Sequence, residues 1–107
     1  MADGQRQHAR VTGPFDGLRV ASSIETPVRI YDLSEGGCFV TSMHAASADG
    51  RPILLKVDLP TEGWLTMRGE VLYSKPPFGY AVRFTEMTED TRARLEAALT
   101  ALRTART

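Results

Sequence analysis

The segment Ile53-Leu-Leu-Lys-Val-Asp-Leu-Pro-Thr-Glu-Gly-Trp-Leu-Thr-Met-Arg-Gly-Glu-Val-Leu-Tyr73 decides the fold class of this 107-residue chain. Apolar and polar residues alternate over 53–59, and the alternation resumes after a turn at residues 60–63. One face of the two runs carries Ile53, Leu55, Val57, Leu59, Leu65, Met67, Val71 and Tyr73. A period of two is typical of a strand with one buried face, and two such runs joined by turn residues indicate an antiparallel hairpin.

Shorter runs of the same kind lie on both sides of this hairpin. They cover residues 18–20, 27–31, 38–40 and 80–84, with Gly, Pro, Asp and Ser between them. The tail changes period: Leu95, Leu99 and Leu102 are spaced for one face of a helix, and Thr88 is a suitable N-cap. The sequence therefore predicts an all-β fold with a C-terminal α-helix, the strands forming an antiparallel sandwich or small barrel.

The first 17 residues show no sustained period. They are polar and are interrupted by Gly4, Gly13, Pro14 and Gly17. Such a segment predicts a flexible N-terminal arm over residues 1–17, followed by the strands and helix over 18–107. A chain of this length accommodates one domain.

Composition excludes several classes of function. Thirteen basic and thirteen acidic residues leave no net charge, so the chain is not built to bind nucleic acid or an anionic membrane by bulk attraction. The single cysteine excludes an internal disulfide and any multi-cysteine metal site. No apolar run approaches the ~18 residues of a membrane span, and the start lacks the pattern of a signal peptide, so we expect a cytoplasmic protein without membrane insertion.

The residues of enzyme chemistry are few and scattered. His8 and His44 lie in polar segments without the spacing of a metal-ligand pair. Cys38 belongs to an alternating run, where a free cysteine is usually a small buried residue. No glycine-rich phosphate loop leads into a helix. We therefore expect no enzyme, no bound metal and no resident cofactor.

Two short patterns remain as candidate binding elements. The pair Arg6-x-x-x-Arg10 is no rarer than chance, whereas Asp32-Leu-Ser-Glu-Gly-Gly37 contains an Asp-x-Ser-x-x-Gly pattern expected only about 0.03 times. Its structural alternative is a tight turn, since Asp and Ser cap turns and Gly supplies positive φ. As a binding set, arginine donates paired hydrogen bonds to guanine or phosphate, and aspartate complements the guanine N–H donors. Guanine with phosphate is therefore the natural ligand of these residues.

Together, the order and spacing of the two patterns resemble the PilZ domain, a family of bacterial receptors for cyclic di-GMP. The segments Leu55–Pro60, Gly69–Tyr73 and Gly79–Phe84 and the C-terminal helix are also similar to that family. The resemblance implies a six-stranded antiparallel β-barrel with a C-terminal helix. It also implies that cyclic di-GMP is the ligand and that no catalysis takes place.

The resemblance further implies a role for each motif residue. Arg6 and Arg10 would clamp the phosphates and contact the guanines, while Asp32 and Ser34 would read a guanine edge. Gly37 would keep the turn open, and the arm would fold over the ligand and signal to a downstream protein partner that the sequence does not identify. The alternative is a PilZ-like protein-interaction module that works without the nucleotide.

Overall fold

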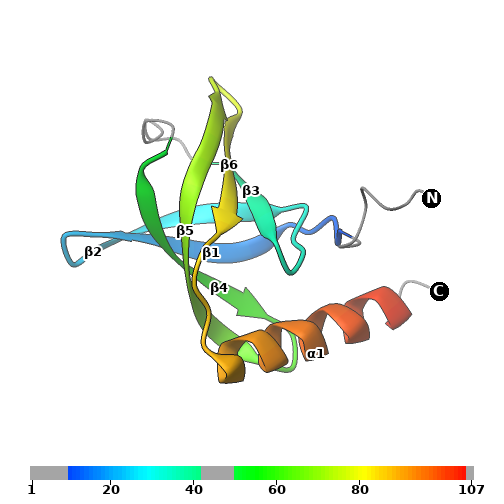
Figure 1. Cartoon of the computed structure of the whole chain (residues 1–107). Helices are drawn as coiled ribbons and strands as arrows, with labels where there is room; N and C mark the ends of the chain where they lie inside the picture. Colours follow the sequence, from blue (N-terminus) through cyan, green and yellow to red (C-terminus); the bar gives the residue numbers. More distant parts are fainter. Residues whose placement is uncertain (1–9, 42–49, 106–107) are drawn as a thin grey trace.

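Six antiparallel strands close into a barrel, and one helix follows them. The computed structural model describes residues 10–41 and 50–105. The barrel order is β1-β2-β3-β6-β5-β4, which confirms the expected architecture (Figure 1). The elements are β1 (Phe15–Ala21), β2 (Ile24–Tyr31), β3 (Gly37–Thr41), β4 (Pro52–Leu59), β5 (Gly63–Lys75), β6 (Gly79–Phe84) and α1 (Glu89–Ala105).

The barrel interior is filled by the apolar face of each strand. In β4 the alternation expected from the sequence holds without exception, and Leu55 and Val57 are almost completely buried. In β2, Val28 and Ile30 point inward, as the pattern predicted. Each large apolar side chain that leaves water contributes about 1.5–3 kcal/mol, so this interior is the main source of the barrel's stability.

Strand β5 departs from the predicted pattern near its end. The sequence placed Tyr73 on the same face as Val71, but Val71 is buried and Tyr73 is 47% exposed. The pairing with β6 shifts register between these two residues, so Leu72 is an extra residue without a counterpart. Such a bulge turns the following side chain to the other face, and the expectation for Tyr73 was therefore wrong.

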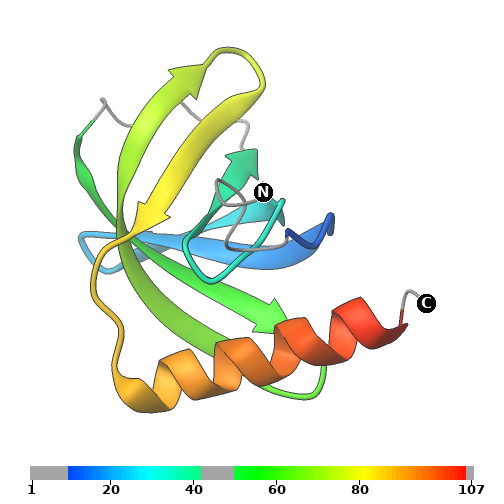
Figure 2. The ribbon, with the colours of Figure 1, turned by 45° about the vertical axis from the view of Figure 1, so that its right-hand side comes forward.

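The C-terminal helix lies along the barrel, as Figure 2 shows, and its apolar stripe is turned toward the core. Leu95 and Leu99 are fully buried and Leu102 is partly buried, so the predicted stripe is confirmed. The N-terminus is capped as expected, because the Thr91 N–H donates to Thr88 Oγ1 at 3.1 Å. Within the described residues, no helix has both the length and the hydropathy needed to cross a bilayer.

The barrel begins earlier than the sequence suggested. Strand β1 starts at Phe15, inside the segment 1–17 that was expected to form the arm. Val11 is also only 4% exposed and belongs to the apolar core. Residues 11–17 are thus held by packing and pairing that short apolar patterns do not reveal. Residues 1–9, including Arg6 and His8, lie outside the described part of the chain, as does His44.

Candidate ligand-binding site

A short antiparallel bridge joins the segment before β1 to the loop after β2. The Val11 N–H donates to the Leu33 carbonyl at 2.8 Å, and the Leu33 N–H donates to the Val11 carbonyl at 2.9 Å. The Asp32 N–H donates to the Thr12 carbonyl at 3.1 Å. Because the two segments run antiparallel, Arg10 lies on the side of the bridge where the loop continues toward β3. The bridge therefore brings the second arginine of one motif to the other motif.

Asp32 and Arg10 are both exposed at this corner. Asp32 has a φ of +53°, a left-handed conformation that aspartate tolerates better than most residues. If the motif forms a turn, a glycine is expected to adopt the positive φ. In this loop the aspartate adopts it instead. The conformation bends the chain directly after β2 and leaves the Asp32 carboxylate in solvent.

Ser34 is buried within the loop, with 6% of its surface exposed. Its Oγ accepts a hydrogen bond from the Gly36 N–H at 3.2 Å, and its own N–H donates to the Gly37 carbonyl at 2.9 Å. These contacts are those of a serine that holds a turn. In this conformation the hydroxyl is engaged with the loop backbone, whereas the sequence analysis expected it to face the ligand.

Gly37 begins β3 and pairs with Arg83 of β6. A Cβ atom at this position would lie 2.2 Å from the Val82 carbonyl oxygen, a distance that no side chain can adopt without moving the backbone. Its role is therefore close approach between two strands. Gly37 has no positive φ, so its requirement for glycine comes from this close approach and not from turn conformation.

The loop is also tied to the end of the helix. Arg103, near the last turn of α1, makes a two-pronged contact with Glu35, with nitrogen–oxygen distances of 3.3 and 3.4 Å. Both side chains are mostly shielded from solvent, at 30% exposure for Arg103 and 19% for Glu35. This pair could not be predicted from the sequence, since 68 residues separate its members and neither belongs to a periodic signal.

The cysteine beside this corner is not activated as a nucleophile. Cys38 follows Gly37, but burial raises the pKa of its thiol to about 12, so the thiolate is scarcely formed at neutral pH. Among the described residues, no group of three His, Cys, Asp or Glu side chains is placed to hold a metal ion. The corner offers an exposed guanidinium and an exposed carboxylate on two bridged segments, which suits binding of a ligand that carries both anionic and N–H donor groups.

Comparisons with known proteins agree with this architecture. A family model described as the PilZ domain matches residues 4–101. The PilZ domain of YcgR from Escherichia coli, solved with c-di-GMP, superposes with a TM-score of 0.69 at 16% identity, covering 95% of each chain. No curated protein sequence matches the chain.

Two longer proteins contain the same fold. YcgR from Escherichia coli in complex with c-di-GMP gives a TM-score of 0.75 at 20% identity over 95% of this chain. The inhibitor of motility MotI/DgrA from Bacillus subtilis gives 0.70 at 19% identity over 91% of this chain. The present chain spans about half of each, namely 48% of that YcgR chain and 50% of MotI.

Proposed function

The chain belongs to the PilZ domain family, and from this premise we propose that it is a receptor for cyclic di-GMP without catalytic activity of its own. The observation that carries the proposal is the bridge between Val11 and Leu33, which brings Arg10 to the Asp32 loop. The complex of YcgR with c-di-GMP, a protein of the same fold, gives further support.

Each exposed group at the corner complements a part of this ligand. The guanidinium of Arg10 donates paired hydrogen bonds to a phosphate or to guanine O6 and N7. Arg6 supplies a second such group four residues earlier in the chain. The carboxylate of Asp32 accepts from guanine N1–H and N2–H₂. Ser34 and Gly37 act as positioning residues that keep the Asp32 loop in shape.

Isothermal titration with cyclic di-GMP tests the proposal directly. Arg6→Ala or Arg10→Ala should weaken binding roughly 10–150-fold, the cost of a charge-assisted paired contact. Asp32→Asn should weaken it as well, because an amide cannot replace both carboxylate oxygens as acceptors. Arg92→Ala is the matched control, since Arg92 is an exposed arginine at the start of α1 and should leave binding unchanged.

GTP and cyclic di-AMP serve as ligand controls and should bind at least tenfold more weakly. Absence of binding heat at high concentrations of cyclic di-GMP would overturn the proposal and favour the nucleotide-independent interaction module. Equal loss in Arg10→Ala and Arg92→Ala would also contradict it, because the effect would then not belong to this corner.

We further propose that binding closes residues 1–9 over the ligand and that this closure is the signal to a downstream protein. The support is the position of Arg10, which follows Arg6 in the chain and leads into the anchored Val11. Hydrogen exchange measured with and without cyclic di-GMP should show protection of residues 1–9 that Asp32→Asn reduces. Unchanged exchange in these residues at saturating ligand would contradict the closure.

A further inference from the structure

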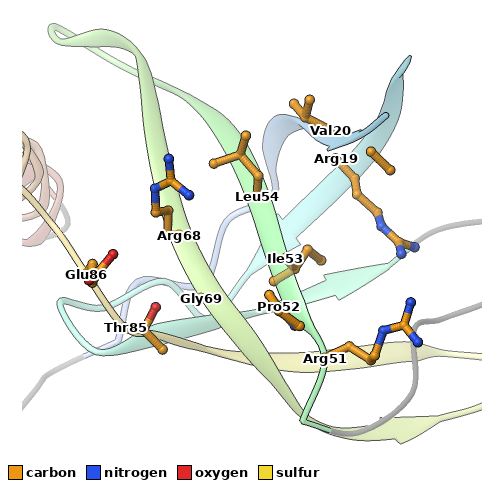
Figure 3. A pocket seen from close by; sticks show the side chains of 11 residues that line it. Arg19, Val20, Arg51, Pro52, Ile53, Leu54, Arg68, Gly69, Thr85 and Glu86 are labelled. Carbon is orange, nitrogen blue, oxygen red and sulfur yellow. The ribbon is translucent and has the colours of Figure 1, made fainter. Parts of the chain in front are cut away.

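Two adjoining hollows form a continuous groove on the barrel wall, away from the ligand-binding corner. The first, of about 430 Å³, lies over the ends of β1 and β4, and the second, of about 640 Å³, reaches the start of α1. Their linings share Leu54, Arg68, Thr85 and Glu86, so the two hollows are one feature, called here the basic groove. In Figure 3, Leu54 lies between Arg68 of β5 and Arg19 of β1, and Arg51 precedes β4.

Three of the arginines that line the basic groove have no carboxylate partner among the described residues. Arg51, Arg68 and Arg92 are exposed, and none forms an ion pair within the part of the chain that the structure describes. Glu86 is the one acidic residue among the described residues of the lining. The groove therefore has a local excess of positive charge in a chain whose formal net charge is zero.

Several basic side chains elsewhere on the described part of the chain form ion pairs with acidic neighbours. Among the described residues these pairs include Arg29–Asp16, Lys56–Glu25, Arg83–Glu70, Arg94–Glu62, Arg94–Asp90 and Arg103–Glu35. A chain with equal numbers of acidic and basic residues has enough carboxylates to form ion pairs with the arginines of the groove as well. That three arginines in one groove are left without them indicates that the groove is arranged for an external anion.

The lining also decides which class of anion fits. Apolar residues, among them Val20, Leu54 and Met87, line the groove together with the arginines. An acidic peptide with interspersed apolar side chains satisfies both parts of this surface. A nucleic acid would leave the apolar parts uncovered and would gain nothing from the chain's zero net charge.

We infer that the basic groove is a docking site for an acidic, partly apolar peptide segment of a partner protein. None of the groove residues belongs to the corner formed by Arg10, Asp32, Ser34 and Gly37. Docking therefore needs no cyclic di-GMP, and its success or failure is measured separately from the proposed receptor function.

Fluorescence anisotropy tests the inference with three labelled probes, in the absence of cyclic di-GMP. They are an eight-residue peptide of alternating glutamate and leucine, the same peptide with lysine for glutamate, and an eight-nucleotide thymidine strand. The glutamate peptide should bind more tightly than the other two, and its affinity should fall as salt rises. Tighter binding of the thymidine strand, or no binding of the glutamate peptide, would overturn the inference.

Charge reversal locates the binding surface. Arg68→Glu in β5 and Arg92→Glu in α1 should each weaken the glutamate peptide at least fivefold. Lys75→Glu is the matched control, since it makes the same charge change at another exposed position of β5 and should alter affinity less than twofold. Thermal midpoints of the three variants check that they fold, and equal loss in Lys75→Glu and Arg68→Glu would overturn the groove assignment.

Discussion

Val11 and Leu33 exchange a reciprocal pair of backbone hydrogen bonds, and both side chains are buried. This relationship fixes where the N-terminal segment meets the loop after β2. Since the contact is made by backbone atoms, it places Arg10 at the loop independently of the Arg10 side chain. The pairing therefore holds the two segments together without any contribution from the Arg10 side chain.

Substitutions at Val11 separate the backbone contact from side-chain packing. Val11→Pro removes the N–H that donates to Leu33 and should cost about 1–3 kcal/mol of stability. It should also weaken cyclic di-GMP binding more than Val11→Ala, which keeps both hydrogen bonds and loses only packing. Urea unfolding and calorimetric titration of the two variants check this. Equal affinities in the two variants would show that the bridge does not position Arg10.

Gly37→Ala should be strongly destabilising for its size. The added Cβ would meet the Val82 carbonyl oxygen at 2.2 Å, so β3 and β6 would have to separate where they pair. Forced overpacking of this kind costs about 1–3 kcal/mol. We expect a lower thermal midpoint and weaker ligand binding, because the displaced strand carries the end of the loop. A variant with an unchanged midpoint would contradict the close-approach role of Gly37.

The ion pair between Glu35 and Arg103 should couple the loop to α1 energetically. A double-mutant cycle with Glu35→Gln and Arg103→Gln should give a coupling of about 1 kcal/mol, the upper range for ion pairs that are partly exposed. The matched cycle uses Asp16 and Arg29, which lie 3.8 Å apart and are 73% and 60% exposed. The coupling energy in this matched cycle should be close to zero. Equal coupling energies in the two cycles would contradict an energetic link between the loop and α1.

The Cys38 thiol gives a prediction in alkaline solution. Burial raises its pKa from an ordinary 9.0 to about 12, so between these values the unfolded chain releases the proton and the native chain retains it. Stability is therefore intact below pH 9 and decreases as pH rises toward 12. At pH 10 this contribution is on the order of 1 kcal/mol. Cys38→Ala should lack it, so urea unfolding at pH 7.5 and 10 should show a smaller alkaline loss than in the wild type.

Parallel losses in the wild type and Cys38→Ala would contradict the assignment to this thiol. A second readout is its reaction with a thiol reagent at pH 8. The reaction should be slow in the native chain and fast in urea, since the reactive thiolate forms only after exposure.

Most strand positions could be predicted because a buried face imposes a period of two. The inward residues of β2 and β4 follow directly from this rule, and the helix stripe follows from the helical period. Tyr73 could not be placed, because the bulge beside it depends on how β5 is shared between two neighbouring strands. The position of Val11 could not be predicted either, because one buried residue has no period.

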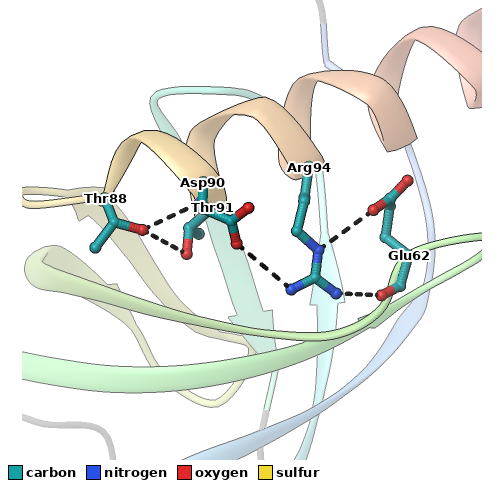
Figure 4. A network of polar contacts seen from close by, with 5 residues as sticks. All are labelled: Glu62, Thr88, Asp90, Thr91 and Arg94. Carbon is teal, nitrogen blue, oxygen red and sulfur yellow. Dashed lines mark hydrogen bonds and ion pairs between the residues drawn. The ribbon is translucent and has the colours of Figure 1, made fainter.

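Long-range polar contacts were equally inaccessible to sequence reasoning. Arg94 of α1 donates to both the side chain and the carbonyl of Glu62, in the turn between β4 and β5, and also lies near Asp90 (Figure 4). Only the Asp90 contact has a helical spacing that could be recognised in advance. The contact with Glu62 exists because the closed barrel brings that turn beneath the helix.

The linear order of residues was sufficient to predict most strand faces, the helix stripe and the helix cap, since each depends on neighbours a few positions away. Folding in three dimensions alone decided that Arg10 meets the Asp32 loop, that Ser34 turns inward, and that unpaired arginines gather in one groove. These features arise from barrel closure, which joins segments far apart in the chain through backbone pairing and excluded volume. No local period encodes such contacts.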